Sequence, residues 1–332
     1  MSIAETLYQN LNLKKINKSK SGALLLFPQN YIAEKYRNFF DISFEKGAFD
    51  EAFEIVTNGK GNEISKINSV ISSSLLSLLC FYPLFKNSDN KIISFNLNIN
   101  DQNLQVPFNK SFFEIRNKVI KSPSCMDIVL QSTDKTKLLF LESKFCEYLD
   151  KNKTEKYGIT YYNELYKDEP LFTILKDNGI VISKKGKKML MVSKNEKYIA
   201  GIKQTISHII GILRGPQDET DSFYSKEYLE SYKKAYNDAS MLIYGTILYN
   251  PCALGNEEAK NDFDNYKKLY SNIIGNNGSE ILKQIKNSPI IKEKNSKKIC
   301  ILSEPLTYQP FLLHNQNYSE ILSEKIKKFY KF

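Results

Sequence analysis

Two carboxylates and one ammonium group stand in a stretch of the chain that is otherwise apolar. Asp127 interrupts the run 126–130, and Glu142 and Lys144 close the run 140–144. Burying an unpaired charge is costly, and neighbouring carboxylates raise each other's pKa. A divalent cation neutralises such groups, and Mg²⁺ favours one or two carboxylates together with waters and phosphate oxygens. The residues therefore predict a metal and phosphate chemistry, in which the lysine holds water or meets developing charge.

Two short strands must position these groups. Residues 126–130 and 140–144 are apolar, β-branched or aromatic, and a short polar turn separates them. Such a pair predicts an antiparallel hairpin, in which side chains alternate between the two faces. Glu142 and Lys144 then share one face, and Asp127 shares it if the register allows.

A simpler interpretation is a surface Glu-x-Lys pair on an amphipathic strand, because such tripeptides are common by chance. Two features favour the chemical interpretation. One is Asp127 on the preceding strand, and the other is the run Leu138-Leu139-Phe140-Leu141 that leads into Glu142. Together they place charged groups in what otherwise looks like the interior of a sheet, so we expect Asp127, Glu142 and Lys144 to act as one unit.

The spacing of Asp127 and Glu142-Ser143-Lys144 resembles the PD-(D/E)xK nuclease signature of the restriction-endonuclease-like fold. Fourteen residues separate the aspartate from the glutamate. The proline of the signature is displaced, because Pro123 stands four residues before Asp127 and Met126 occupies the adjacent position. Many members of the superfamily lack that proline.

Other short motifs resemble a bacterial family of proposed restriction endonucleases, over a span from residue 45 to residue 312. They are Gly61-Asn62-Glu63-Ile64, a helix with Ser72-Ser73-Ser74, Glu142-Ser143-Lys144-Phe145, the helix with Gln204 and His208, and Leu306-Thr307-Tyr308-Gln309. The resemblance rests on these motifs and not on continuous identity.

The resemblance implies an α/β fold, with a mixed central sheet flanked by helices. It also implies that Asp127 and Glu142 bind the metal and that Lys144 orients or deprotonates the attacking water. The products would carry 5′-phosphate and 3′-hydroxyl ends. Around this core we expect an N-terminal helical extension over residues 1–44, a nuclease domain over residues 45–315 and a basic C-terminal helix over residues 316–332.

Two residues on predicted helices are further candidates. Glu63 falls at the N-terminal edge of an amphipathic helix predicted over residues 64–81 by its isoleucine and leucine spacing. It is either an acid that suits the helix dipole or, as the resemblance favours, a third metal ligand. Gln204 resembles the polar residue that such enzymes place near the scissile phosphate, on the helix after the catalytic strands.

Two more residues receive structural assignments. Glu114 stands upstream of the signature and could join the acidic cluster, but we expect a strand-surface acid. His208 follows Gln204 by one helical turn, on a row that the isoleucine stripe places on the opposite side from the core. His314 is the only other histidine in the sequence, so we do not expect a metal site built on histidines. We expect His208 to act only as a hydrogen-bonding residue.

The remaining pattern predicts alternating helices and strands. We expect two helices over residues 31–57, a half-buried strand with its continuation over 91–106, a strand over 112–120, a tyrosine-rich helix over 154–167, a hairpin over 180–197, a helix over 199–213, a central parallel strand over 241–249, two helices over 258–286, a last strand region at 299–308 and a basic helix over 318–332.

The net charge and the composition limit which classes of binding partner are expected. The formal net charge is +10 and the sequence pI is about 9.0, which allows a polyanion. Lys184, Lys185, Lys187 and Lys188 cluster on the predicted hairpin and are candidate DNA contacts, although lysine runs are often only solvated turns. Five scattered cysteines support neither a disulfide framework nor a zinc site.

No long apolar run or signal pattern is present, so we expect a cytoplasmic protein with no membrane partner, and a homodimer remains open. The favoured function is a Mg²⁺-dependent endonuclease of restriction type acting on DNA, with Mn²⁺ as a substitute cation. One alternative is a nucleic-acid-binding protein of the same fold without cleavage activity. Another is a Mg²⁺ enzyme that acts on a nucleotide or other small phosphate.

Overall fold

A computed structural model gives the arrangement of most of the chain. It describes residues 3–10, 17–19, 24–27, 32–58, 67–85, 91–119, 123–145, 154–157, 171–177, 179–185, 188–193, 201–217, 224–255, 257–288, 291 and 296–332. None of the helices in these ranges is both long and apolar enough to cross a membrane.

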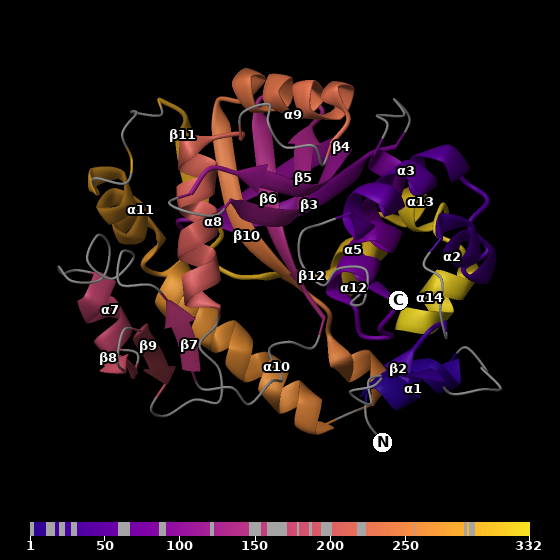
Figure 1. Cartoon of the computed structure of the whole chain (residues 1–332), viewed down its shortest axis with the longest axis horizontal. Helices are drawn as coiled ribbons and strands as arrows, with labels where there is room; N and C mark the ends of the chain where they lie inside the picture. The colour runs from indigo at the N-terminus through magenta and orange to yellow at the C-terminus, as the bar shows by residue number, and fades with distance from the viewer. Residues whose placement is uncertain are drawn as a thin grey trace.

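A curled mixed sheet lies at the centre of the molecule (Figure 1). Within the described ranges it has seven strands, in the order β11-β10-β6-β5-β4-β3, with β12 also paired to β10. The strands are β3 (Ile93–Ile99), β4 (Gln102–Asn117), β5 (Ser124–Ser132), β6 (Lys137–Lys144), β10 (Met241–Leu248), β11 (Lys298–Ile301) and β12 (Leu306–Thr307). The predicted α/β class and the mixed sheet are confirmed.

The β5–β6 hairpin that carries the signature has the predicted antiparallel register. Ile128 pairs with Leu141, and Gln131 pairs with Leu138. The turn between the strands uses Lys135 in the left-handed region, with φ of 60°. The predicted hairpin is therefore confirmed, and it places residues 127 and 142 at the same end of the two strands.

Strand β10 pairs in parallel with β6 on one side and with β11 and β12 on the other. Its side chains are buried along nearly the whole strand, as a central strand with both faces covered requires. The predicted central parallel strand and the last strand region are confirmed. At the other side of the sheet, residues 102–117 form one long strand, so the predicted start of a separate strand at residue 112 was wrong.

Helices cover both faces of this sheet. Neighbouring residues of a strand point to opposite faces, and on β6 Glu142 contacts α8 (Ile202–Arg214) while Ser143 contacts the start of α5 (Ser73–Phe81). These two helices therefore lie on opposite faces of the hairpin. The others near the sheet are α9 (Lys226–Asp238), α10 (Glu257–Tyr270), the π-helical turn Ser271–Gly275, α11 (Gly278–Asn287), the 3₁₀ turn Pro251–Leu254 and α12 (Tyr308–His314).

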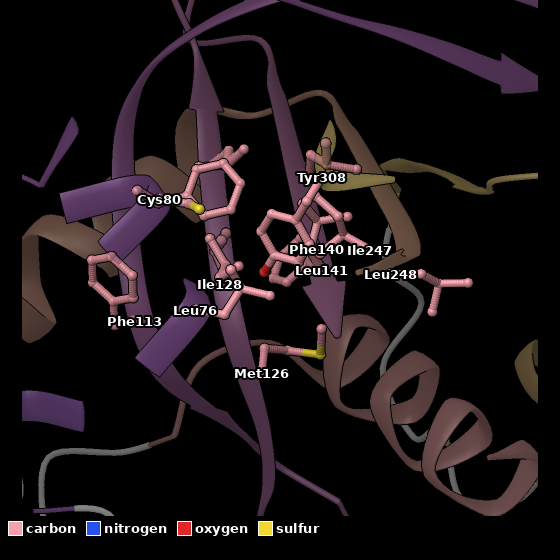
Figure 2. Packing of buried hydrophobic residues seen from close by; sticks show 14 of the residues in the cluster. Leu76, Cys80, Phe113, Met126, Ile128, Phe140, Leu141, Ile247, Leu248 and Tyr308 are labelled. Carbon is pink, nitrogen blue, oxygen red and sulfur yellow. The ribbon is translucent and has the colours of Figure 1, made fainter. Parts of the chain in front are cut away.

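The face with α5 is a packed apolar layer. Leu76 and Cys80 of α5, Met126 and Ile128 of β5, and Leu141 of β6 are all buried. Figure 2 shows these side chains within the core. Each fully buried side chain of this size contributes roughly 1.5–3 kcal/mol relative to exposure, so the layer fixes the hairpin firmly from behind.

Helix α5 begins later than the sequence pattern predicted. The Ser72 hydroxyl accepts a 3.1 Å hydrogen bond from the Leu75 amide, which makes Ser72 the N-cap. Ser69 instead forms a β-bridge with Leu25. The predicted continuous helix over 64–81 was therefore wrong at residues 68–72, because a serine cap and a strand contact outweigh the isoleucine spacing, and residues 64–66 lie outside the described residues.

The two ends of the chain pack together beside the sheet (Figure 1). The N-terminal elements are α1 (Ile3–Asn10), β1 (Asn17–Lys18), β2 (Leu24–Leu25), α2 (Ala33–Phe39) and α3 (Lys46–Thr57), and the 3₁₀ turn Tyr82–Leu84 follows α5. The C-terminal ones are α13 (Gln316–Ser319) and α14 (Glu324–Tyr330). The two predicted N-terminal helices are confirmed, whereas the predicted single helix over 318–332 is interrupted, since α13 ends at Ser319 and α14 begins at Glu324. One buried cluster includes residues from Ile3 to Tyr330, and the predicted domain boundaries stay predictions.

A small separate sheet has the order β7-β9-β8. Its strands are β7 (Thr154–Tyr157), β8 (Ile180–Lys185) and β9 (Lys188–Ser193), and α7 (Leu171–Asp177) precedes β8. The predicted lysine-rich hairpin is confirmed, since Lys185 pairs with Lys188. The predicted helix over 154–167 was wrong for its first four residues, which form β7, and its remainder lies outside the described residues.

Candidate functional site

A cavity of about 440 Å³ opens where β4, β5 and β6 meet the start of α5 and helix α8. Asp127, Glu142, Lys144 and Gln204 all line it. The structure thus brings together four of the predicted site residues, from two adjacent strands and one helix. Ser72, Ser73 and Ser74 form part of the wall opposite α8.

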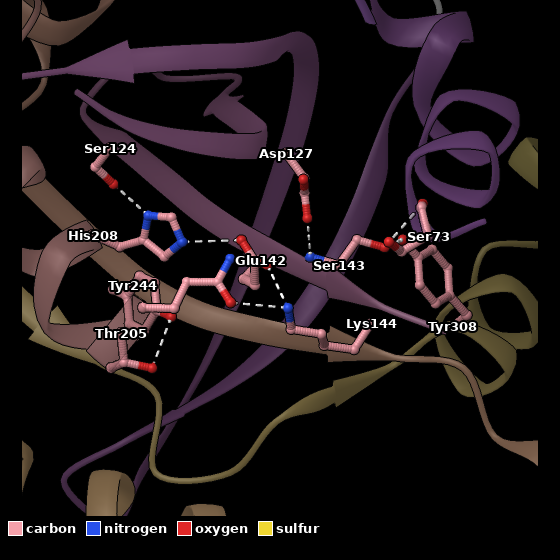
Figure 3. Close-up of polar contacts among 11 residues, drawn as sticks. Ser73, Ser124, Asp127, Glu142, Ser143, Lys144, Thr205, His208, Tyr244 and Tyr308 are labelled. Atoms are coloured by element: carbon pink, nitrogen blue, oxygen red, sulfur yellow. Dashed lines mark hydrogen bonds and ion pairs between the residues drawn. The ribbon is translucent and has the colours of Figure 1, made fainter. Parts of the chain in front are cut away.

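Glu142 is the centre of the polar contacts (Figure 3). Its Oε1 accepts hydrogen bonds from the Lys144 ammonium at 2.7 Å and from the Gln204 amide nitrogen at 2.6 Å. Lys144 also donates to Gln204 Oε1 at 3.0 Å, which closes a ring of three side chains. Lys144 is therefore held against the carboxylate two residues earlier on its own strand, as the shared face predicted.

His208 occupies the other side of the same carboxylate. Its Nε2 lies 3.0 Å from Glu142 Oε2, and its Nδ1 is hydrogen-bonded to the Ser124 hydroxyl. The prediction that His208 faces away from the core was wrong, because the side chain is only 3% exposed. The polar side of α8 faces the sheet because its Gln204 and His208 contact the buried Glu142 carboxylate on β6. The isoleucine spacing alone did not indicate this contact.

A glycine allows α8 to come this close. A Cβ atom on Gly211 would lie 3.0 Å from the Asn117 Cβ and 3.1 Å from the Ser124 Cβ, tighter than ordinary van der Waals contact. The close approach of helix to strands is what brings Gln204 and His208 within reach of Glu142.

The surroundings of Glu142 keep it ionised. Burial raises its pKa, but the Lys144 ammonium and the contact with His208 outweigh burial and lower the pKa to about 2. Glu142 is thus a buried carboxylate whose charge is compensated by groups of the protein itself.

Asp127 is in the opposite situation. Its Oδ2 accepts a 2.7 Å hydrogen bond from the Ser143 amide, in the place where a strand carbonyl would otherwise pair. Desolvation raises its pKa well above the ordinary value, and the charges of Glu142 and Glu114 raise it further. Lys144 and the Ser143 amide lower it, but by less. Ionised Asp127 therefore lacks sufficient positive charge around it.

Glu114 joins the cavity wall although we expected a strand-surface acid. It is 7% exposed, and its Oε2 accepts a 3.0 Å hydrogen bond from the Cys125 thiol. Its backbone has φ of 52° inside a strand, and its carbonyl accepts a hydrogen bond from the Tyr224 hydroxyl. Strained backbone of this kind gathers at functional sites. The available sequence signal was an acid inside the apolar run 112–115.

The residue between Glu142 and Lys144 anchors the other face. The Ser143 hydroxyl donates to the Ser73 carbonyl at 3.2 Å and bonds the Tyr308 hydroxyl at 2.8 Å. These contacts, drawn in Figure 3, fix the start of α5 against β6. They thereby place the serine-rich wall of the cavity.

The carboxylate oxygens in this cavity are the type of ligand that a hard cation such as Mg²⁺ prefers. Asp127 and Glu142 supply carboxylate oxygens in one cavity, and Mg²⁺ commonly takes one or two carboxylates while keeping several waters. Among the described residues, no group of three or more His, Cys, Asp and Glu side chains is arranged to hold a metal ion. Within the described part of the chain, two carboxylates therefore face one cavity without forming a closed protein cage for a metal ion.

Several predicted residues could not be placed. Glu63 and Lys187 lie outside the described residues. Lys184, Lys185 and Lys188 belong to β8 and β9, but their side chains are not described. Comparison of the chain with protein-family models, with curated proteins and with solved structures found no match.

Proposed function

We propose that this protein is a metal-dependent nuclease that hydrolyses phosphodiester bonds of DNA. The observation that carries the proposal is the convergence of Asp127, Glu142, Lys144 and Gln204 on one cavity. Two carboxylates can hold a metal ion, and an ammonium and an amide can meet the charge of a phosphate, as metal-dependent phosphodiester hydrolysis uses them. Here they stand on a buried hairpin, where the under-compensated charge of Asp127 costs stability unless a function retains it.

A restriction-endonuclease-like core is part of this proposal. Its support is an antiparallel hairpin with the acidic residues at one end, β10 in parallel beside it, and helices on both faces. The spacing of Asp127 and the Glu-Ser-Lys tripeptide agrees with the signature of that fold.

Asp127 and Glu142 would hold the cation. When bound, Mg²⁺ supplies positive charge that offsets the carboxylates, lowers the pKa of the attacking water and polarises the scissile phosphate. The raised pKa of Asp127 gives the site an electrostatic reason to take a cation, because its ionised form is under-compensated by protein groups.

Lys144 would position the attacking water and meet the charge that develops on the phosphate. Its ammonium now bonds both Glu142 Oε1 and Gln204 Oε1, so it is held at the cavity rather than in solvent. Gln204 would hold the Lys144 ammonium and the Glu142 carboxylate in their relative positions, and it would donate a hydrogen bond to a phosphate oxygen. Behind the hairpin, the buried apolar layer on the α5 face closes that side of the site to solvent.

One observation favours the second candidate, a nucleic-acid-binding protein without cleavage activity. Glu142 Oε1 already accepts hydrogen bonds from Lys144 and Gln204, and Oε2 lies 3.0 Å from His208 Nε2, so this carboxylate is stabilised without a metal. Under that alternative the cluster would be a structural ion-pair network. The raised pKa of Asp127 weighs against it, because a purely structural network has no reason to retain an under-compensated acid.

The test is incubation of the purified protein with plasmid and genomic DNAs, methylated and unmethylated, in Mg²⁺ and in Mn²⁺. The proposal expects metal-dependent conversion to linear or shorter products with at least one DNA. Binding of DNA without cleavage under every condition would instead favour the second candidate.

A further inference from the structure

Helix α5 begins at the wall of the candidate cavity, and two backbone donors of its first turn have no protein partner in the described part of the chain. The first four amides of an α-helix cannot bond within the helix. In α5 the Ser72 amide donates to the Ser69 carbonyl at 3.1 Å, and the Leu75 amide donates to the Ser72 hydroxyl at 3.1 Å. The two amides left over are those of Ser73 and Ser74, and both residues line the cavity.

A buried hydroxyl at the same place also lacks a partner. Ser74 lines the cavity and is only 8% exposed. Its hydroxyl makes no hydrogen bond among the described residues, whereas the Ser77 hydroxyl donates to the Ser74 carbonyl at 2.9 Å. Burying a hydroxyl without a partner costs free energy, which a group bound in the cavity would recover.

These donors belong to the same cavity as the candidate metal ligands Asp127 and Glu142. The Ser143 hydroxyl donates to the Ser73 carbonyl at 3.2 Å, so the first turn of α5 is held against the strand that carries Glu142 (Figure 3). The free amides and the dipole of a helix N-terminus attract anions, and phosphate groups in particular. The cavity therefore combines acceptors for a cation with donors for an anion.

We propose that the start of α5 is a phosphate-binding site, in which the Ser73 and Ser74 amides and the Ser74 hydroxyl donate to oxygens of one phosphate group. The inference rests on the proposed function for the source of that group, a phosphodiester of DNA. The cavity is also lined by the carboxylates of Glu114, Asp127 and Glu142, which repel an anion. Phosphate should therefore bind only when a cation offsets their charge.

Two variants remove these donors one at a time. Ser73→Pro deletes an amide, and proline is well tolerated at the first position of a helix. The preceding Ser72 has φ of −73° and ψ of 120°, which a following proline permits. Ser74→Ala removes only the hydroxyl. Because that hydroxyl has no partner among the described residues, Ser74→Ala should melt no lower than the unchanged protein.

Matched controls lie at the starts of two other helices. Helix α9 has the same kind of serine cap, since the Ser225 hydroxyl accepts a 3.2 Å hydrogen bond from the Tyr228 amide. Lys226→Pro deletes the first amide of that helix, as Ser73→Pro does in α5. Ser279→Ala removes an exposed hydroxyl from the second residue of α11. Neither control residue lines the cavity.

The probe is inorganic phosphate at pH 7, whose binding is followed by the broadening of its phosphorus NMR signal as protein is added. We expect the unchanged protein to bind phosphate with Mg²⁺ present and not without it, and Ser73→Pro and Ser74→Ala to bind it several-fold more weakly. Ser73→Pro should also slow single-turnover cleavage of DNA by a factor of about ten, the loss of one hydrogen bond to a charged group. Both controls should match the unchanged protein.

Equal phosphate binding by the unchanged protein, Ser73→Pro and Ser74→Ala would overturn the site, and so would an unchanged protein that binds no phosphate in Mg²⁺. Full-rate DNA cleavage by a Ser73→Pro variant that no longer binds phosphate would overturn its assignment to a phosphodiester. If the unchanged protein cleaves no DNA in Mg²⁺ or Mn²⁺, the nuclease proposal fails by itself. Phosphate binding then still decides whether α5 holds an anion, so the two failures are distinguishable.

Discussion

His208 Nε2 lies 3.0 Å from Glu142 Oε2, and this contact joins helix α8 to the strand that carries the Glu-Ser-Lys tripeptide. Ser124 bonds the opposite ring nitrogen, so the imidazole is held from both sides. With Lys144 and Gln204 on Oε1, the carboxylate is restrained at both oxygens. Helix α8 is therefore part of the site and not only a cover for the sheet.

We expect His208 to act as a positioning residue for Glu142. His208→Phe keeps the ring in the core but removes both nitrogen contacts, whereas His208→Gln offers an amide donor near the position of Nε2. The Phe variant should lose about 10- to 100-fold in Mg²⁺ affinity or kcat, the usual effect of removing a partner that orients a metal ligand, and the Gln variant should recover much of it.

Calorimetric Mg²⁺ titration and single-turnover cleavage check this prediction, with thermal melting to confirm that each variant is folded. A purely structural role would lower the melting temperature of both variants and leave Mg²⁺ affinity unchanged in each.

Glu142 should stabilise the folded protein in a pH-dependent way. Its pKa falls from the ordinary 4.5 to about 2 in the folded state, which corresponds to roughly 3 kcal/mol. Because the folded pKa is depressed, this stabilisation is fully present above pH 4.5 and is lost as the pH falls toward 2. Glu142→Gln should therefore destabilise the protein at pH 7, and the difference from the unchanged protein should shrink below pH 4.5. Urea unfolding across this range measures it, and a pH-independent difference would contradict the prediction.

Asp127 should have the reverse effect. Its folded pKa lies well above the ordinary 3.8, so the ionised carboxylate costs stability at neutral pH, and the cost disappears once the pH falls below that ordinary value. Asp127→Asn keeps an oxygen for the Ser143 amide and removes the charge. We expect a higher melting temperature than that of the metal-free unchanged protein at pH 7, and no advantage at pH 3. A lower melting temperature at pH 7 would show that the charge is compensated.

The lysine-rich hairpin of β8 and β9 remains a prediction as a DNA contact. Replacing Lys184, Lys185, Lys187 and Lys188 by Gln should weaken binding to all DNA sequences alike, and each lost phosphate contact should flatten the salt slope by about 0.9. Cleavage at saturating DNA should survive, because the proposed metal-binding residues Asp127 and Glu142 lie on other strands, β5 and β6. A slope equal to that of the unchanged protein would leave these lysines as a solvated turn.

The sequence pattern was sufficient to predict elements that depend on residues close together in the chain. Two short apolar runs and a polar turn predicted the β5–β6 hairpin, and isoleucine spacing predicted α8. It was insufficient where the determinant is a contact distant in the chain. His208 is buried because Glu142 lies under it, 66 residues earlier in the numbering. Glu114 reaches the cavity through an unusual backbone angle that no local spacing indicates.

The central claim is that Asp127 and Glu142 serve metal-dependent hydrolysis, and cleavage by the unchanged protein and Asp127→Asn tests it most directly. Both proteins are incubated with the same DNA substrate in Mg²⁺, with Lys144→Met as a third sample and with melting curves taken on the same preparations. We expect the unchanged protein to leave 5′-phosphate and 3′-hydroxyl ends, and each variant to lose at least about a hundredfold in rate, although Asp127→Asn is the more stable protein. Near-full cleavage by folded Asp127→Asn would contradict the claim.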